Sequence, residues 1–248
     1  LGKGVKKLSL GDHVVFAFLP SCGSCSYCHT GRAALCEPGA EANGKGTLLG
    51  GHQRIHNKGD YYYHHLGVSG FAELAVASVD SLVKIDQEIP FEIAALFGCA
   101  VMTGVGAVVN TAQLKFGESI LIVGLGGVGL SAILGAKAAG ASNIIVADLN
   151  PQKRAKGLEL GAHHTVDSSK KNALQLLKDL SGGGVDVALE FAGAIPALEF
   201  AFNATKRGGT TVTAALPHPD AKLEISPVTL VGQEKSIKGS YLGSCIPV

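Results

Sequence analysis

The sequence predicts an α/β fold with a doubly wound parallel sheet, and three observations support this class. After residue 118, short apolar runs alternate with helical stretches of about ten residues, the arrangement that connects parallel strands. The first run, Ile120 to Val123, is rich in β-branched residues, as expected of a strand buried on both faces. Hydrophobic residues make up 46% of the 248 residues and charged residues 17%, which suffices for a substantial core. The chain can therefore form one large domain or two modest ones.

A glycine pattern follows this first strand directly. Residues 124–129 read Gly-Leu-Gly-Gly-Val-Gly, which is G-x-G-x-x-G. The first glycine allows a tight turn, the second leaves room for a pyrophosphate, and the third lets the next helix approach the strand. The helix N-terminus offers unpaired N–H groups and a partial positive charge to the phosphates. The candidate cofactor-binding residues are Gly124, Leu125, Gly126, Gly127, Val128 and Gly129.

Asp148 ends a second predicted strand, Ile144 to Ala147, and lies 19 positions after Gly129. Its carboxylate can accept hydrogen bonds from both hydroxyls of an adenosine ribose, and it would repel a 2′-phosphate. The order of strand, glycines, helix, strand and Asp therefore predicts binding of NAD rather than NADP. An ordinary βαβ turn is the alternative interpretation of the glycines alone.

The alternation continues to residue 216. Asn150 and Pro151 provide an N-cap and a first helical residue, and Gly161 provides a stop. The predicted helices span about 128–139, 151–160, 172–180 and 195–205. The predicted strands span 120–123, 144–147, 165–166, 185–191 and 210–216.

The first part of the chain is less regular. We expect a turn and a strand within 8–19, a long polar surface loop over 37–60, and one or two strands within 71–83. A helix is expected over 91–97, after Pro90. Core candidates in this part are Phe71, Leu74 and Val76.

Charge and hydropathy exclude several function classes. The net charge of +1 gives no reason to expect nucleic acid or a membrane surface as a partner. No stretch approaches about 20 uninterrupted apolar residues, so we expect no transmembrane helix. The cytoplasm is the expected compartment.

Four cysteines within 15 residues form the strongest metal signal. Cys22, Cys25, Cys28 and Cys36 fit C-x2-C-x2-C-x7-C. Tight turns at this spacing can place four thiolates around one zinc ion, and Gly23 and Gly31 suit such turns. Four protein sulfurs leave no open position, so this zinc would be structural. Two disulfides are the alternative.

Together these motifs resemble the zinc-containing medium-chain alcohol dehydrogenase family. The cysteine cluster is similar to that family's structural-zinc lobe, and the glycine pattern to its dinucleotide fingerprint. Further similar segments are Leu66–Glu73, Phe97–Gly104 and Lys238–Ser240. The resemblance implies a GroES-like catalytic domain over 1–98, N-terminally incomplete, and a Rossmann domain over 99–240. Residues 241–248 would start the return to the catalytic domain.

The resemblance also implies residue roles. Cys99 would be a ligand of a catalytic zinc, where the alternative is a buried structural thiol. Thr103 and Val128 would lie near the nicotinamide, and Lys153 near the adenosine ribose. The nicotinamide end would also be approached by Ala214, Ala215 and Leu216.

By the same resemblance, the family's first zinc-binding Cys and its Gly-His-Glu segment would precede Leu1. We therefore expect the chain to be an internal fragment of a dehydrogenase, with an incomplete catalytic zinc site. The spacing of four histidines matches no zinc motif, so we do not expect them to replace those ligands. They are His52, His56, His64 and His65.

The implied reaction is hydride transfer between an alcohol and NAD, with zinc lowering the pKa of the bound alcohol. Two alternatives remain: a zinc-free quinone reductase of the same superfamily, and a module that binds NAD and zinc without chemistry. A homodimer or homotetramer is expected by resemblance only. The alcohol itself is not predicted.

Overall fold

The computed structural model describes residues 1–247, so Val248, the last residue of the predicted segment 241–248, lies outside the described residues. The chain forms two compact units. The first contains Leu1–Cys99 together with residues 245–247, and the second contains Ala100–Ser244.

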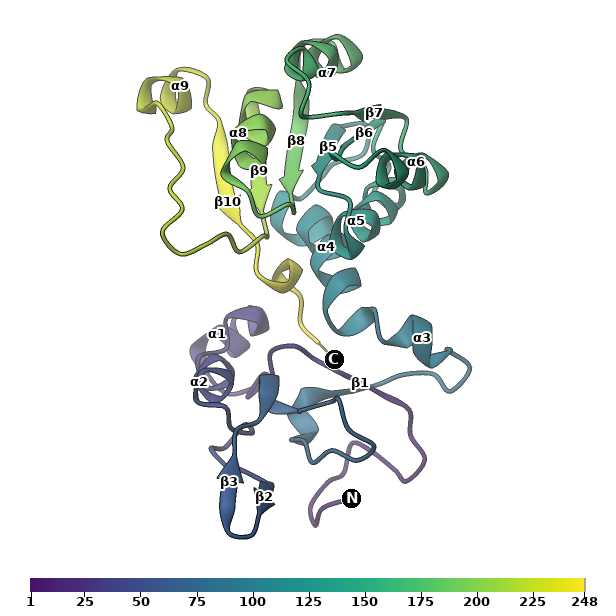
Figure 1. Ribbon diagram of the computed structural model, residues 1–248, viewed down its shortest axis with the longest axis vertical. Coiled ribbons are helices and arrows are strands. Elements are labelled where there is room, and N and C mark those ends of the chain that lie inside the picture. The colour runs from purple at the N-terminus through teal and green to yellow at the C-terminus, as the bar shows by residue number, and fades with distance from the viewer. Residues whose placement is uncertain (248) are drawn as a thin grey trace. The chain divides into compact units, whose positions relative to one another are not determined.

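The second unit is built on a six-stranded sheet (Figure 1). Its strand order is β10-β9-β8-β5-β6-β7, and all neighbouring strands are parallel, so the predicted doubly wound parallel sheet is confirmed. The strands are β5 (Ser119–Val123), β6 (Asn143–Ala147), β7 (His164–Val166), β8 (Val185–Glu190), β9 (Thr205–Thr213) and β10 (Ser236–Gly239).

Helices cover both faces of this sheet because successive strand residues point to opposite sides. Ile122 of β5 packs in one buried cluster with Ile133 of α5, while Val123 packs in another with Leu177 of α7. The helices of this unit are α4 (Met102–Gly106), α5 (Gly127–Ala138), α6 (Pro151–Glu159), α7 (Ala173–Ser181), α8 (Ile195–Ala204) and α9 (Pro227–Gly232), with a 3-10 turn at Leu242–Ser244.

The order of the strands creates a switch point. From β5 the chain moves outward to β6 and β7, returns to β8 beside β5, and then continues to β9 and β10. The connections after β5 and β8 therefore leave the sheet on opposite sides. Such a switch point opens a crevice at the carboxyl ends of the two strands, where ligands of this fold class bind.

The predicted elements between residues 119 and 204 agree with the observed ones to within one residue at each end. The strand predicted over 210–216 is wrong at both ends, because β9 starts at Thr205 and stops at Thr213. Gly208 has a φ of +72°, and the β8–β9 register shifts near the start of this strand. Such an irregular strand contains glycines that are typical of a turn.

The first unit contains two small antiparallel sheets. One pairs β1 (Val14–Phe16) with β4 (Leu82–Lys84), which confirms the strand predicted within 8–19. The other pairs β2 (Ile55–Asn57) with β3 (Asp60–Tyr62). The remaining elements are α1 (Ser26–His29), α2 (Glu37–Lys45), α3 (Phe91–Ala94) and 3-10 turns at Ala33–Leu35, His65–Gly67 and Val79–Ser81.

The prediction of a loop over 37–60 is wrong, because this stretch contains α2 and most of a hairpin. Cys36 caps α2 through its sulfur, Pro38 occupies the first turn, and Gly46 ends the helix with a left-handed conformation. The hairpin turns at Lys58 and Gly59, which both have positive φ, as a two-residue type I′ turn requires. Both α2 and the hairpin are rich in polar and glycine residues, and such a composition predicts a loop.

The core candidates within 71–83 are wrong as well. Phe71, Leu74 and Val76 are all exposed, and the residues before Val79 form no strand in the described part of the chain. An alternating pattern is buried only when a partner covers one face of the strand. The only strand in this stretch starts at Leu82.

Helical turns continue from Phe91 to Ala112, with π-helical turns at Phe97–Val101 and Ala107–Ala112. The helix expected over 91–97 is thus the start of a longer one. Its length and apolar composition would allow it to cross a membrane. Ala107 and Val108 in this helix are fully buried in the same cluster as β5 and α5.

Candidate metal and nucleotide sites

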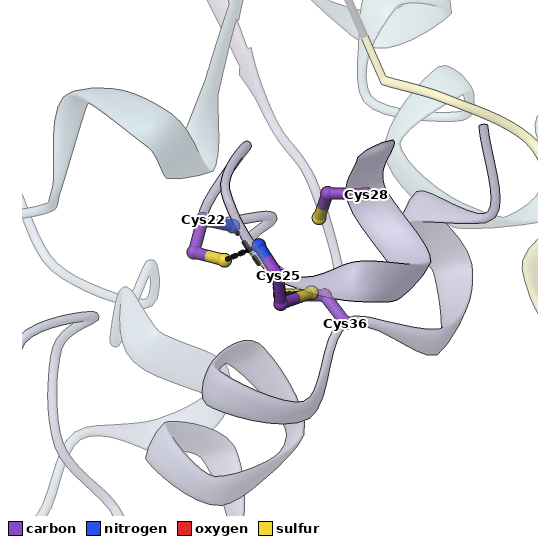
Figure 2. A group of neighbouring side chains, drawn as sticks. All are labelled: Cys22, Cys25, Cys28 and Cys36. Atoms are coloured by element: carbon purple, nitrogen blue, oxygen red, sulfur yellow. Dashed lines mark hydrogen bonds between the residues drawn. The ribbon is translucent and has the colours of Figure 1, made fainter. Parts of the chain in front are cut away.

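Four cysteine side chains converge in the first unit (Figure 2). Their sulfur atoms all lie within 4.8 Å of one another and belong to Cys22, Cys25, Cys28 and Cys36. Gly23 and Gly31 have φ values of +71° and +76°, so each reverses the chain between ligands as the spacing predicted. The structure brings together every residue of the predicted cluster.

Short helices fix the positions of these sulfurs. Cys28 lies on α1, while Cys36 is completely buried and precedes α2. The Cys36 sulfur accepts the N–H of Gly39 at 3.4 Å. A Cβ on Gly39 would lie 1.9 Å from the carbonyl oxygen of Pro20, so only glycine allows α2 to approach this close.

Backbone N–H groups favour the thiolate form of Cys22. Its sulfur accepts from Ser24 N–H at 3.5 Å and from Cys25 N–H at 3.3 Å. The Ser24 contact is the main reason that the pKa of the Cys22 thiol is lowered to about 6. Burial raises the pKa of the Cys28 thiol to about 12. Four thiolates this close repel one another, so full ionisation of the cluster requires a cation among them.

The cluster fits zinc. A tetrahedral ion with Zn–S bonds of about 2.3 Å separates its sulfurs by about 3.8 Å. The sulfurs of Cys25 and Cys36 are 4.0 Å apart. The four cysteines of the cluster form no disulfides with one another, so the alternative of two disulfides is not formed. The residues that would hold the ion supply four soft donors and leave no position for a substrate.

The second site is a pocket of about 580 Å³ in the second unit, at the carboxyl ends of β5, β6 and β8. It lies at the switch point of the sheet, where a nucleotide site is expected. Predicted residues that line it are Gly124, Leu125, Gly126, Asp148 and Lys153.

The three motif glycines have separate structural reasons. Gly124 has a φ of +89°, and an added Cβ would lie 2.7 Å from the nitrogen of Ala192. A Cβ on Gly129 would lie 2.0 Å from the carbonyl oxygen of Gly124. A Cβ on Gly126 would meet nothing within 4 Å. Protein packing therefore requires glycine at the first and third positions, and the open space at Gly126 suits the close approach of a ligand.

The helix after these glycines has no side-chain cap. Gly126 is its N-cap residue and accepts the N–H of Leu130 through its carbonyl oxygen. The N–H groups of the first turn are left for another partner, and a phosphate is the usual one.

Asp148 lies at the rim of the pocket, at the end of β6. Its two carboxylate oxygens accept the N–H of Leu125 at 2.7 Å and the N–H of Asn150 at 2.8 Å. The carboxylate thus holds the glycine turn against β6. Each oxygen keeps a further lone pair that can accept a hydroxyl group.

Other predicted cofactor residues do not line this pocket. Gly127, Val128 and Gly129 lie in the first turn of α5, and Ala214–Leu216 lie beyond the end of β9. Thr103 is buried on α4, and within the described residues its hydroxyl has no hydrogen-bond partner. The roles given to these residues by resemblance stay predictions.

The part of the pocket that follows β8 was not predicted from the sequence. Phe191, Ala192 and Ala194 line it, as do Ser168 and Ser169 after β7. The rule that ligands bind beyond the carboxyl ends of parallel strands could have indicated both segments. Neither carries a recognisable motif.

Cys99 is exposed, and in the part of the chain that the structure describes it belongs to no group of three or more potential metal ligands. His64 is buried and its Nε2 accepts the N–H of Arg54 at 2.9 Å, so that nitrogen is already hydrogen-bonded. The expectation that the four histidines do not replace the missing zinc ligands stays a prediction. A catalytic zinc site needs three protein ligands, and the described residues do not assemble such a set at Cys99.

Comparison with known proteins matches both halves of the chain to described families. The family model "Zinc-binding dehydrogenase" matches residues 127–247, and the model "Alcohol dehydrogenase GroES-like domain" matches residues 1–87. The first match begins within the glycine turn, at Gly127, and contains Asp148, and the second contains the cysteine cluster.

Named relatives and a solved structure agree with these models. A Mycobacterium tuberculosis protein named as an alcohol dehydrogenase is 39% identical, and the match covers 100% of this chain and 68% of that protein. The NDMA-dependent alcohol dehydrogenase of Amycolatopsis methanolica is 37% identical, with 100% and 67% covered. An alcohol dehydrogenase zinc-binding domain protein from Burkholderia ambifaria superposes with a TM-score of 0.93 at 33% identity, with 100% and 67% covered. The chain therefore spans about two thirds of the length of the proteins it matches.

Proposed function

Because the chain belongs to the zinc-binding alcohol dehydrogenase family, we propose that it is an oxidoreductase that transfers hydride between an alcohol and NAD. The preference for NAD over NADP rests on the Asp148 carboxylate, which lines the pocket. A 2′-phosphate on the adenosine ribose would approach this negative charge, whereas two ribose hydroxyls could donate to it.

The four-cysteine cluster supports a structural zinc. Four protein sulfurs close the coordination sphere, so the ion would stabilise the surrounding turns and short helices instead of binding an alcohol. A catalytic zinc would supply a Lewis acid that polarises the alcohol oxygen. By the resemblance, Cys99 is the one residue of this chain that would bind the catalytic zinc. One ligand does not hold the ion, so no reaction step is derived through that zinc.

The test of the nucleotide proposal compares NADH with NADPH. We expect the wild-type chain to bind NADH at least about tenfold more tightly than NADPH, since NADPH loses the ribose hydrogen bond and meets repulsion, and about 1.4 kcal/mol corresponds to that factor. The variant Asp148→Asn removes the charge and should reduce the ratio of the NADPH dissociation constant to the NADH dissociation constant. Asp179→Asn removes an exposed charge on α7 from a residue that does not line the pocket, and should leave the ratio of the two affinities unchanged. Fluorescence titration measures both affinities, and equal or tighter NADPH binding by wild type would contradict the proposal.

The reaction itself is tested by alcohol-dependent reduction of NAD. One relative is named for its dependence on NDMA, so the assay should be run with and without NDMA. Turnover that depends on an alcohol would exclude the alternative that the protein only binds NAD and zinc and catalyses no reaction. Turnover that survives Cys99→Ser and zinc removal would instead favour the zinc-free quinone reductase.

A further inference from the structure

Glu190 is a buried carboxylate whose role is not covered by the proposed function. It is the last residue of β8, and its side chain is only 2% exposed. Its Oε1 accepts the N–H of Ala192 and the N–H of Gly193, both at 2.7 Å. Its Oε2 accepts the hydroxyl of Thr213 at 2.7 Å. Within the described residues Glu190 forms no ion pair, so uncharged donors alone compensate for the loss of hydration.

The first element that Glu190 holds is the turn after β8. Two consecutive N–H groups of this turn point at one carboxylate oxygen, which fixes the turn at the end of the strand. Phe191 and Ala192 belong to it and line the pocket. The same turn packs on the glycine motif, since a Cβ on Gly124 would lie 2.7 Å from the nitrogen of Ala192.

The second element is the carboxyl end of β9. Thr213 pairs with Glu190 in the sheet register, and the backbone N–H of Ala214 donates to the Glu190 carbonyl at 3.2 Å. A Cβ on Gly193 would lie 3.6 Å from the Cβ of Ala215. The side chain of Glu190 therefore joins the turn after β8 to the segment that follows β9.

We propose that Glu190 is a positioning residue for the half of the dinucleotide that lies over β8 and β9, an inference that rests on the proposed NAD site. A dinucleotide lies across the switch point, with one mononucleotide on each side of it. Asp148 directly follows β6 on one side, and Glu190 is the last residue of β8 on the other. The first half contains the adenosine ribose that Asp148 selects, so the second half contains the nicotinamide.

A matched pair of substitutions separates positioning from charge. In Glu190→Gln the side-chain oxygen can still accept both N–H groups, and the amide nitrogen can donate to the Thr213 hydroxyl. In Glu190→Ala all three hydrogen bonds are lost, and two N–H groups are left without their acceptor. A positioning role therefore predicts that Gln restores what Ala loses.

The experiment measures binding of AMP and of NADH to each folded variant. AMP contains only the half that lies over β5 and β6, whereas NADH spans both halves. We expect Glu190→Ala to weaken NADH binding by about tenfold or more and to change AMP binding by less than about twofold. Glu190→Gln should bind NADH within about threefold of wild type. Leu177→Ala, which loses buried contacts on α7, is the control for lost stability and should leave both affinities unchanged.

Three results would overturn the inference. They are an unchanged NADH affinity in Glu190→Ala, an equal loss of AMP and NADH affinity, and a Gln variant as weak as the Ala variant. If Glu190→Ala does not fold, Thr213→Val removes one hydrogen bond and should weaken NADH binding selectively. Its control is Thr211→Val on the same strand, because the buried Thr211 hydroxyl has no partner within the described residues. A wild-type chain that binds neither AMP nor NADH would instead refute the proposed nucleotide site.

Discussion

At the scale of single residues, His64 shows how burial disfavours the protonated, charged form of a histidine ring. Its side chain is 3% exposed, its Nε2 accepts the N–H of Arg54, and within the described residues its Nδ1 has no partner. Because Nε2 accepts, the proton of the neutral ring lies on Nδ1. Protonation of Nε2 would break the bond to Arg54 and bury a charge. Burial accordingly lowers the pKa of His64 below its usual value of 6.5.

This lowered pKa predicts a loss of stability in mild acid. Below about pH 6.5 the unfolded chain protonates His64 while the folded chain resists it, so the free energy of unfolding falls by at most about 1.4 kcal/mol per pH unit. The loss ends when the pH falls below the folded-state pKa. Urea titrations of the zinc-loaded protein between pH 7 and 5 measure it.

The matched variants for this test lie at nearby positions. Glutamine has no titrating ring, so His64→Gln should flatten the pH dependence. His56→Gln, on the exposed hairpin, should keep the pH dependence of wild type. Equal slopes in both variants would assign the acid sensitivity to other groups.

At the scale of elements, the strand–turn–helix unit uses its glycines in two different ways. Gly129 lets α5 pack on the turn, because its Cβ would overlap the carbonyl oxygen of Gly124. Gly126 faces open space, so its lack of a side chain serves the ligand and not the fold. Both residues belong to one motif, and only the structure distinguishes their reasons.

This difference predicts opposite phenotypes for two alanine substitutions. Gly129→Ala should lower the free energy of unfolding by about 1–3 kcal/mol, because two backbone segments must move apart. Gly126→Ala should leave stability within about 0.5 kcal/mol and weaken NADH binding by about tenfold or more. Thermal unfolding and fluorescence titration measure the two effects. A destabilised Gly126→Ala that binds NADH normally would reverse the assignment.

The cysteine cluster predicts a measurable zinc content. We expect about one zinc per chain, and none in Cys28→Ser, because three sulfurs and a poor oxygen donor no longer form a closed tetrahedral site. Cys99→Ser serves as the control and should retain the zinc. Metal analysis after gel filtration gives the stoichiometry. Loss of zinc in Cys99→Ser but not in Cys28→Ser would mean that the ion lies elsewhere.

At the scale of the whole molecule, the two compact units have separate candidate ligands. The cysteine cluster belongs to the unit of residues 1–99, and the nucleotide pocket belongs to the unit of residues 100–244. Binding to a folded unit stabilises that unit, and the gain depends on ligand concentration.

Calorimetry should therefore resolve two unfolding events. Removal of zinc with a chelator should lower the temperature of one event, since metal binding contributes to folding. NADH at about one hundred times its dissociation constant should stabilise the other by about 2.7 kcal/mol. A single event that responds to both ligands would show that the units unfold together.

Much of the second unit could be predicted from sequence because its signals are local. Apolar runs and helix-length segments between residues 119 and 204 identified the strands and helices to within one residue. The strands are buried on both faces, so their composition is unambiguous. The first unit was predicted less well, because α2 and the β2–β3 hairpin are short and rich in polar and glycine residues.

By itself the sequence determined the strands and helices between residues 119 and 204, the cysteine cluster and the residues of the glycine turn, since each depends on spacing over a few tens of residues. The tertiary structure decided the strand order, the exposure of Phe71 and Leu74, and the turn after β8 as part of the pocket. It also decided the role of Glu190, which bonds to a hydroxyl 23 positions away. The physical reason is that burial and hydrogen-bond partners depend on which distant segments pack together, and a local pattern does not encode that choice.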